Sequence, residues 1–477
     1  MSVDLLLIFV IFLPFLGSFF VLLSKDGEKQ TFENAVHSAA FTVFVNILLI
    51  LSLFSFMPLT PALDEIGYSI RFLPFMKFSF GADMITLLFM LGCQMAVFAG
   101  VFGIKYENQN QRHILFYALL YLSFLNGYFL ALDIMSFFIF FMLQLFPLYM
   151  LIGWCLPENR HTLLVRLFVH YFLGAMLLLA ASIFILSLKQ DDILLFNIDK
   201  MHLSYRKSIM VWGGIFFALI LRVPVWPFHY VLSSVCAVLK NPLAFIALSI
   251  MPLTGIYGFM RCWPLNIPFE ISVLSPVFQA LCVVTMVFAA FSAYVNFGGG
   301  RKLLNYVFIY DLLYLLAVFL PTDTIGLNIA YSVFSFLLIT ACLVVIEVFI
   351  LRESIKANVN VRGMLCKMPR ASLCYSLFVL AAAQLPVSAF FGNNFVIVSN
   401  IFNYHLYMGI AIVCSMTIGA LCLFRGVYIL RDESCALLEK DQIKDLDMGT
   451  FMLMMLFMAV LFLSLVNPLW FAVLKGI

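Results

Sequence analysis

The stretch Arg222-Val-Pro-Val-Trp-Pro-Phe-His229 lies inside an apolar run and carries two prolines, Pro224 and Pro227. Proline has no backbone N–H, so it removes a hydrogen bond from the interior of a helix and breaks or kinks it. Non-helical backbone at membrane depth is tolerated only where protein or a water-filled cavity surrounds it. The stretch therefore predicts a broken helix inside a bundle of membrane helices.

A second stretch of the same kind follows later, Gln384-Leu-Pro-Val-Ser-Ala-Phe-Phe-Gly-Asn-Asn394, with its breaker at Pro386. Taken alone, these prolines are equally compatible with simple packing kinks. Their regular spacing along the chain favours a repeated architecture with one broken helix in each repeat.

The composition places the breaks in a membrane. Of the 477 residues 64% are hydrophobic and 11% are charged, against about 25% charged residues in an ordinary soluble domain. The net charge of +3 is carried in short loops, which excludes a basic groove for nucleic acid. The 11 cysteines show no spacing typical of metal ligands. We therefore expect an all-α, multi-pass membrane protein with no metal site and no redox cofactor of its own.

Counting about 20 apolar residues per crossing gives about 14 spans. They are expected near 3–23, 35–57, 83–104, 113–132, 134–155, 164–187, 209–231, 241–261, 270–296, 303–320, 325–351, 371–399, 404–430 and 449–474. The breaks then fall in the fourth helix of each of two five-helix blocks, and an odd number of helices inverts the second block.

These blocks predict four parts of the chain. They are residues 1–112 with spans 1–3, residues 113–262 as the first five-helix repeat, residues 263–431 as the second, inverted repeat, and residues 432–477 with a cytoplasmic loop and the last span. Loops after odd-numbered spans hold about twice as many Lys and Arg residues as the others, which places them on the cytoplasmic or matrix side.

Ionisable residues inside spans are costly and are functional candidates by default. The sequence offers Arg222, His229, Asp311, Glu347 and Asp133 as candidates for a proton path. Histidine and carboxylate side chains can take up and release protons. Arginine stays protonated, so it can supply a fixed charge but cannot carry a proton.

Two of the candidates have simpler interpretations. Asp133 separates two adjacent spans and can simply lie at the membrane interface. Glu347 precedes the loop residues Arg352 and Glu353 closely enough to reach water.

Several landmarks together resemble the antiporter-like subunits of proton-pumping NADH:quinone oxidoreductase, respiratory complex I. The stretch FLALDIMSFFIFFMLQLFPLY, residues 129–149, resembles their fifth helix, and residues 222–229 resemble their broken seventh helix. Residues 254–261 resemble the eighth helix, residues 301–306 the entry to the tenth, and residues 385–395 the broken twelfth. The order and extent are most similar to the M-type chain (subunit 4 in mitochondria). The D subunit of multisubunit cation/proton antiporters is a close relative.

The resemblance also identifies ionisable family positions that are lost here. The key glutamate of the fifth helix falls at Met142, with Gln144 nearby, and the lysine of the eighth helix falls at Leu253. The charged residue of the twelfth helix falls at Asn394, and the lysine of the seventh is replaced by Arg222. In addition, Asp311 stands where the family has the central histidine of its tenth helix.

The resemblance implies a membrane subunit of a complex I-type enzyme in the respiratory chain. Such a subunit lies in the proton-translocating arm, packs against other membrane subunits, and has no catalytic chemistry of its own. The lost positions leave proton conduction open. A subunit of a cation/proton antiporter and a non-conducting scaffold or assembly paralogue are the alternatives. We expect a bacterial inner membrane rather than the mitochondrial inner membrane.

Overall fold

The computed structural model describes most of the chain. The described residues are 3–23, 29–56, 66–73, 76–104, 111–157, 160–187, 205–262, 275–295, 299–320, 325–356, 361–386, 388–432 and 443–464. The end of the last expected span, from residue 465, and most of the expected loop 432–448 lie outside them, as does residue 263, where the second repeat is expected to begin.

The N-terminal part contains three helices and a hairpin. These are α1 (Val3–Leu23), α2 (Lys29–Phe54), β1 (Ile66–Leu73), β2 (Met76–Ala82) and α3 (Met84–Phe102). The first expected repeat follows as α4 (Gln111–Leu130), α5 (Ile134–Leu143), α6 (Leu145–Cys155), α7 (His161–Ser187), α8 (Tyr205–Ile220), α9 (His229–Cys236) and α10 (Pro242–Cys262).

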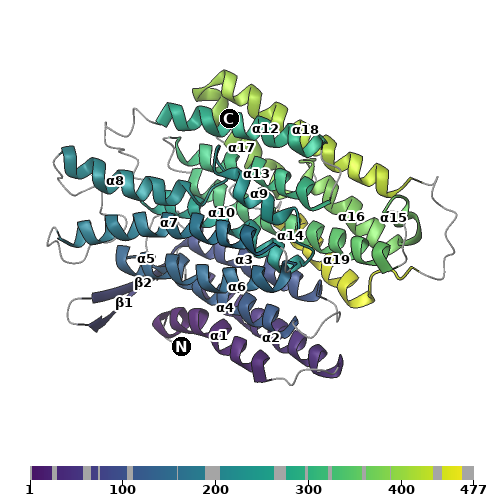
Figure 1. Ribbon diagram of the computed structural model, residues 1–477, viewed down its shortest axis with the longest axis horizontal. Coiled ribbons are helices and arrows are strands. Elements are labelled where there is room, and N and C mark those ends of the chain that lie inside the picture. Colours follow the sequence, from purple (N-terminus) through teal and green to yellow (C-terminus); the bar gives the residue numbers. More distant parts are fainter. Residues whose placement is uncertain are drawn as a thin grey trace.

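The residues of the second expected repeat also form a series of helices. It contains α12 (Ser275–Val295), α13 (Gly299–Val318), α14 (Ile325–Lys356), α15 (Met364–Lys367), α16 (Pro369–Ala382), α17 (Ala389–Tyr404) and α18 (Leu406–Leu430), and α19 (Met448–Leu463) comes last. Figure 1 shows α1 and α2 along one edge of the bundle and α12 and α18 along the opposite edge.

The expected class of fold is confirmed. Among the described residues, ten segments are long and apolar enough to cross a membrane, with α5 and α6 counted as one. The chain is an integral, multi-pass membrane protein, while the full count of about 14 spans stays a prediction. The helices α10 and α14 are buried along nearly their whole length and form the centre of the bundle.

Both expected breaks are present. The first lies between Ile220, the last residue of α8, and His229, the first of α9. The second lies between Ala382, the last residue of α16, and Ala389, the first of α17. We call them the first break and the second break.

Two features differ from the expectation of uninterrupted helices. The strands β1 and β2 pair as an antiparallel hairpin, and their residues alternate between apolar and small or polar types, a pattern typical of strands. The expected span 134–155 is divided at Gln144 into α5 and α6. Pro147 explains this division, because it cannot donate a hydrogen bond to the carbonyl of Leu143 four residues earlier.

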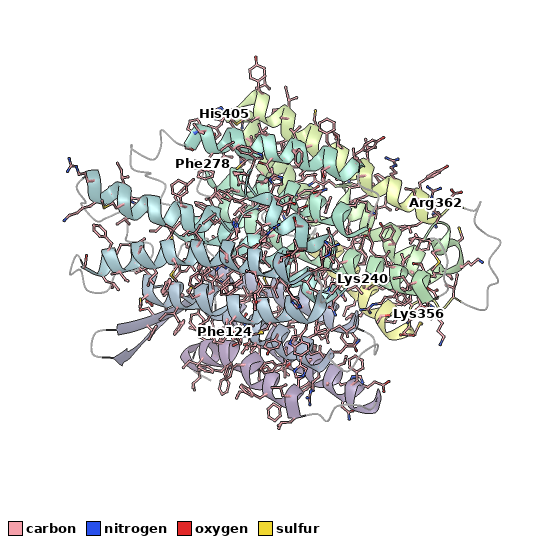
Figure 2. All side chains as sticks on the ribbon, viewed as in Figure 1. Phe124, Lys240, Phe278, Lys356, Arg362 and His405 are labelled. Carbon is pink, nitrogen blue, oxygen red and sulfur yellow. The ribbon has the colours of Figure 1, made fainter. Side chains whose placement is uncertain are left out.

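The ends of the bundle agree with the expected alternation of loops. Lys240, Lys356 and Arg362 lie in loops after odd-numbered spans or at their edges, and all three lie toward the end that carries α15 (Figure 2). His405 follows an even-numbered span and lies toward the other end. Which end faces the cytoplasm stays a prediction.

Candidate functional site: buried polar groups at two helix breaks

The first break is closed by side chains from neighbouring helices. The amide N–H of Val225 bonds to the carbonyl of Val223 at 2.8 Å, so the carbonyl of Leu221 loses its helical donor. His170 of α7 takes that place, with its Nε2 atom 2.8 Å from the Leu221 oxygen. Thr285 of α12 accepts the free N–H of Trp226 at 3.0 Å. The break is therefore a built and hydrogen-bonded structure.

Arg222 lies inside this break and is 1% exposed. Its Nη2 atom donates to the carbonyl of Phe141 at 2.6 Å, and its Nη1 atom lies 3.0 Å from Thr254 Oγ1. The guanidinium also lies 3.4 Å from the centroid of the Phe141 ring, which is the geometry of a cation–π contact. Among the described residues no carboxylate forms an ion pair with it. Arg222 is thus a fixed cation held by neutral groups.

The end of α5 supplies the other side of this arrangement. Gln144 is fully buried, and its Nε2 atom lies 3.4 Å from the same Phe141 oxygen. Met142 is only partly buried. Gln144 and Arg222 therefore share the Phe141 carbonyl oxygen as an acceptor, whereas the sequence singled out Gln144 only as a neighbour of Met142.

The second break uses the same principle with a different residue. In a continuous helix the carbonyl of Ala382 would accept from residue 386, but Pro386 has no N–H. The hydroxyl of Tyr306, from α13, donates to that carbonyl at 3.0 Å. Gln384 adopts a positive φ of 57°, a left-handed conformation that is uncommon for residues other than glycine. The turn is thus stabilised from a neighbouring helix.

Beyond the second break lies a short polar contact. Asn394 of α17 is fully buried, and its Oδ1 atom accepts from the hydroxyl of Ser332 on α14 at 2.8 Å. Its Nδ2 atom has no hydrogen-bond partner among the described residues. At this position, where the sequence resemblance predicts a charged residue, an amide joins two helices.

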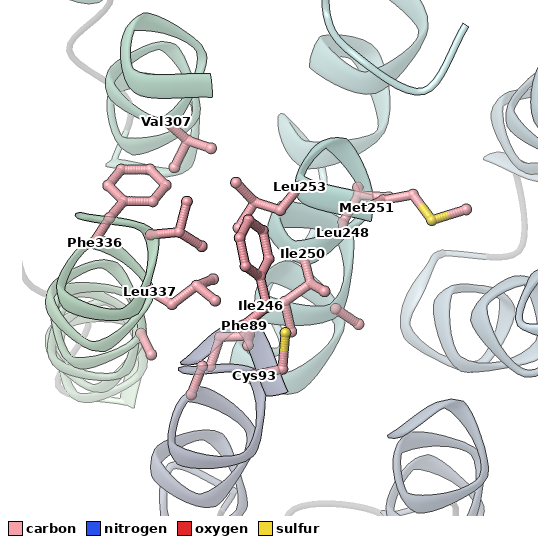
Figure 3. Packing of buried hydrophobic residues seen from close by; sticks show 14 of the residues in the cluster. Phe89, Cys93, Ile246, Leu248, Ile250, Met251, Leu253, Val307, Phe336 and Leu337 are labelled. Carbon is pink, nitrogen blue, oxygen red and sulfur yellow. The ribbon is translucent and has the colours of Figure 1, made fainter. Parts of the chain in front are cut away.

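The surroundings of Leu253 on α10 differ from those of Asn394, because they are apolar. Leu253 lies on the side of α10 that faces Val307 and Phe336, from α13 and α14, whereas Met251 points to the opposite side (Figure 3). The sulfur of Met251 lies 3.4 Å from Arg222 Nη1. A lysine at position 253 would have to enter the apolar contact between α10, α13 and α14.

Asp311 of α13 is fully buried, and neither of its carboxyl oxygens has a hydrogen-bond partner among the described residues. An unpaired ionised carboxylate is very costly in apolar surroundings. Its neighbours on the same helix are Tyr310 and Tyr314, both fully buried. Asp311 is an isolated acid close to the centre of the bundle.

Glu347 of α14 is buried and paired. Its Oε1 atom lies 2.8 Å from Lys302 Nζ of α13, and it accepts from the hydroxyl of Tyr375 of α16 at 2.8 Å. Lys302 also donates to the Tyr375 hydroxyl at 3.2 Å. All three side chains are buried. We call this group the Lys302 triad.

Asp133 has the contacts of a helix cap. Its Oδ2 atom accepts from the N–H of Ser136, and its Oδ1 atom accepts from the N–H of Ser79 on β2 at 2.7 Å. Ser79 and Ser136 thereby tie the hairpin to the start of α5. These contacts favour the structural interpretation of Asp133 over a role in a proton path.

His229 begins α9 and is partly buried. Its ring contacts the ring of Phe288 on α12 edge to face, with centroids 5.4 Å apart. Its Nδ1 atom is buried and has no hydrogen-bond partner among the described residues. Trp226, Tyr230 and Phe288 around it are exposed, so His229 lies near the apolar surface of the bundle.

The structure does not bring the five candidate residues together. Within the described residues, no hydrogen bond or ion pair joins any two of Arg222, His229, Asp311, Glu347 and Asp133. No group of three His, Cys, Asp or Glu in that part of the chain is placed to hold a metal ion. The residues that sequence reasoning missed are Lys302, Tyr375 and the role of His170.

Another buried ion pair joins α3 to α10. Arg261 pairs with Asp83, which also caps the start of α3 by accepting from the N–H of Thr86 at 2.8 Å. Arg261 also donates through Nε to the hydroxyl of Tyr257 at 2.8 Å. This cluster lies at the end of α3 next to the hairpin and has the form of a structural clamp.

Fold and site together define a membrane-helix bundle with two broken helices and buried charges. The family described as NADH:quinone oxidoreductase/Mrp antiporter, TM, matches residues 131–419, which include both breaks. The chain belongs to this family, and the resemblance expected from the sequence is confirmed.

Individual relatives extend the match over most of the chain. NADH-quinone oxidoreductase subunit M of Rickettsia bellii is 24% identical over 432 residues, which cover 87% of this chain and 85% of that protein. NADH-ubiquinone oxidoreductase chain 4 of Mycosarcoma maydis is 24% identical over 411 residues, with 83% of each protein covered.

Solved structures show the same fold. A chain of respiratory complex I from Thermus thermophilus superposes with a TM-score of 0.84 at 20% identity, covering 98% of this chain and 96% of that one. A chain of the Mrp complex from Dietzia gives a TM-score of 0.78 at 14% identity, covering 97% of this chain and 50% of that one.

Proposed function

We propose that this chain is the M-type membrane subunit of a complex I-type NADH:quinone oxidoreductase. It would lie in the proton-translocating arm, pack against other membrane subunits, and leave the redox chemistry to other chains. One observation carries the proposal: the likeness to subunit M relatives covers nearly all of both proteins in sequence, and the likeness to a complex I chain does so in fold.

The proposed repeats are residues 113–262 and 263–431, and residues 1–112 and 432–477 would flank them. The geometry favours different roles for the two repeats in proton translocation. The first repeat has Arg222 as its central charge, and arginine does not release its proton. The second repeat keeps carboxyl groups at Asp311 and Glu347, both fully or nearly fully buried. A proton path through this chain would therefore depend on the second repeat, with His229 at its boundary.

The antiporter alternative has weaker support. The Mrp chain is about twice as long as the region that matches, since only 50% of it is covered, whereas 96% of the complex I chain is covered. The scaffold alternative rests on the lost positions Met142, Leu253 and Asn394. We propose the bacterial cell membrane as the location, because relatives named subunit M come from bacteria such as Rickettsia bellii.

Purification of the tagged, full-length chain from its own membranes in a mild detergent tests the proposal. The expected result is co-purification with subunits of an NADH:quinone oxidoreductase, identified by mass spectrometry. Co-purification with cation/proton antiporter subunits would support the antiporter alternative. A monodisperse, isolated chain would contradict both forms of assembly.

A further inference from the structure

The Lys302 triad joins three helices at one carboxyl oxygen. Lys302 Nζ and the Tyr375 hydroxyl both lie 2.8 Å from Glu347 Oε1. The second oxygen, Oε2, is buried and has no hydrogen-bond partner among the described residues. Lys302 and Tyr375 therefore both contact Oε1. Oε2 can bind a proton while both of these contacts are kept.

The fourth wall of this site comes from α18. A Cβ atom at Gly426 would lie 2.5 Å from Lys302 Nζ and 3.2 Å from the Tyr375 hydroxyl. Any larger side chain at position 426 would displace the ammonium group. Four residues earlier on α18, Cys422 donates to the carbonyl of Ala293 at 2.8 Å. The site is thus enclosed by α13, α14, α16 and α18.

The triad differs from the buried Asp83–Arg261 pair. In the Asp83–Arg261 pair, both the backbone and the side chain of Thr86 bond to Asp83, and Asp83 caps a helix. Glu347 lies in the middle of a continuous helix and caps nothing. Because it caps no helix, its carboxylate is not accounted for by the start of a helix, as that of Asp83 is.

We propose that Glu347 is a proton-holding group of the second repeat, and that Lys302 and Tyr375 are positioning residues that orient its carboxylate. This inference rests on the proposed function. Uptake adds one proton from hydronium to Glu347 Oε2 and takes the pair from zero net charge to +1. Release returns that proton to water and restores zero. Only an O–H bond forms and breaks, and no electron moves.

The experiment uses the complete complex that contains this chain, reconstituted in liposomes. NADH oxidation and proton uptake are measured in the same sample for wild type and for Glu347→Gln, which keeps the size of the side chain and a hydrogen-bonding oxygen. The expected result is a loss of protons taken up per NADH in the complexes that assemble. Glu347→Asp should restore part of the loss.

Glu353→Gln is the matched control. Glu353 is a buried carboxylate on the same helix, but its partner Lys356, at 3.3 Å, is exposed. The proposal predicts an unchanged proton ratio for this variant. An unchanged ratio in Glu347→Gln would overturn the proposal, and so would an equal loss in both variants.

A variant that fails to assemble still leaves a test. Tyr375→Phe and Glu347→Asp both keep the ion pair with Lys302, and each disturbs the orientation of the carboxylate. Both are expected to lower the proton ratio, and a wild-type ratio in both would overturn the proposal. Failure of the proposed function can be distinguished from failure of this inference. In that case the purified wild-type chain would show no associated NADH oxidation at all.

Discussion

The guanidinium of Arg222 lies over the ring of Phe141, 3.4 Å from its centroid, and donates to the carbonyl of the same residue at 2.6 Å. One residue of α5 thus provides both an aromatic face and a hydrogen-bond acceptor to a buried cation. Because these groups are neutral, the cation is stabilised without an ion pair. This contact distinguishes the first break from the Lys302 triad.

Because Arg222 has neutral partners and Glu347 is paired with Lys302, removing the two charges should lower the free energy of unfolding by different amounts. Arg222→Leu leaves no opposite charge behind, so we expect the free energy of unfolding to fall by no more than about 2 kcal/mol, the scale of hydrogen bonds to a charged group. Glu347→Ala leaves Lys302 buried without its carboxylate, and breaking a buried pair costs about 3–5 kcal/mol. Unfolding of the purified chain in mixed micelles would measure both. Equal costs would contradict this account of Arg222.

Gln144→Glu is expected to give Arg222 an acidic partner. The Gln144 amide already lies 3.4 Å from the oxygen that accepts from Arg222, so a carboxylate there would face the guanidinium. We expect the Gln144→Glu variant to assemble normally. Arg222→Leu should then destabilise this variant more than it destabilises the wild type. A double-mutant cycle measures that coupling, and a coupling of zero would show that the two side chains do not meet.

The Asp83–Arg261 clamp predicts a charge-specific effect. Asp83→Asn keeps a good helix cap but leaves Arg261 without its carboxylate, so we expect a loss of about 3–5 kcal/mol of stability. Adding Arg261→Met should recover part of that loss, because the uncompensated charge is then removed. If the double variant lost as much stability as the two single variants together, the two residues would not stabilise the protein as an ion pair.

Tyr306→Phe removes the only donor that the structure places on the Ala382 carbonyl within the described residues. A buried acceptor left without a donor costs about 1–3 kcal/mol, and we expect this loss in the unfolding free energy. Tyr407→Phe is the control, because Tyr407 is 86% exposed. Equal stability of the two variants would show that Tyr306 does not support the second break.

The orientation of the chain can be tested with a native cysteine. Cys366 is exposed and lies in the short helix α15, on the side where the excess of basic loop residues predicts the cytoplasm. A membrane-impermeant thiol reagent should label it in inside-out vesicles and not in intact cells, and Cys366→Ser should reduce the signal. Labelling in intact cells only would mean that the predicted orientation is reversed.

Much of the fold follows from local chemistry that the sequence displays. Pro224, Pro227 and Pro386 each lack an N–H within an apolar run, so the two breaks could be predicted without tertiary contacts. The division at Gln144 had the same kind of signal in Pro147 and was overlooked. Asp133 followed by Ser136 is likewise a local capping pattern, and it explains Asp133 better than a proton path does.

The candidate site depends more on tertiary packing. Lys302 follows a glycine-rich loop, and nothing in its local sequence indicates that it turns inward to Glu347, 45 residues later in the chain. His170 and Tyr306 are similar cases, because each is a donor for a carbonyl that another helix frees. Such pairings require the relative placement of helices, which periodicity does not provide.

Native gel electrophoresis of mild-detergent extracts, with staining for NADH oxidation, tests whether this chain is assembled into a complex I-type enzyme. We expect the tagged chain to migrate far above its own mass of 54.2 kDa, in a band that oxidises NADH, and we expect deletion of the chain to alter or remove this band. Migration of all of the tagged chain apart from any NADH-oxidising band would contradict the assignment to a complex I-type enzyme.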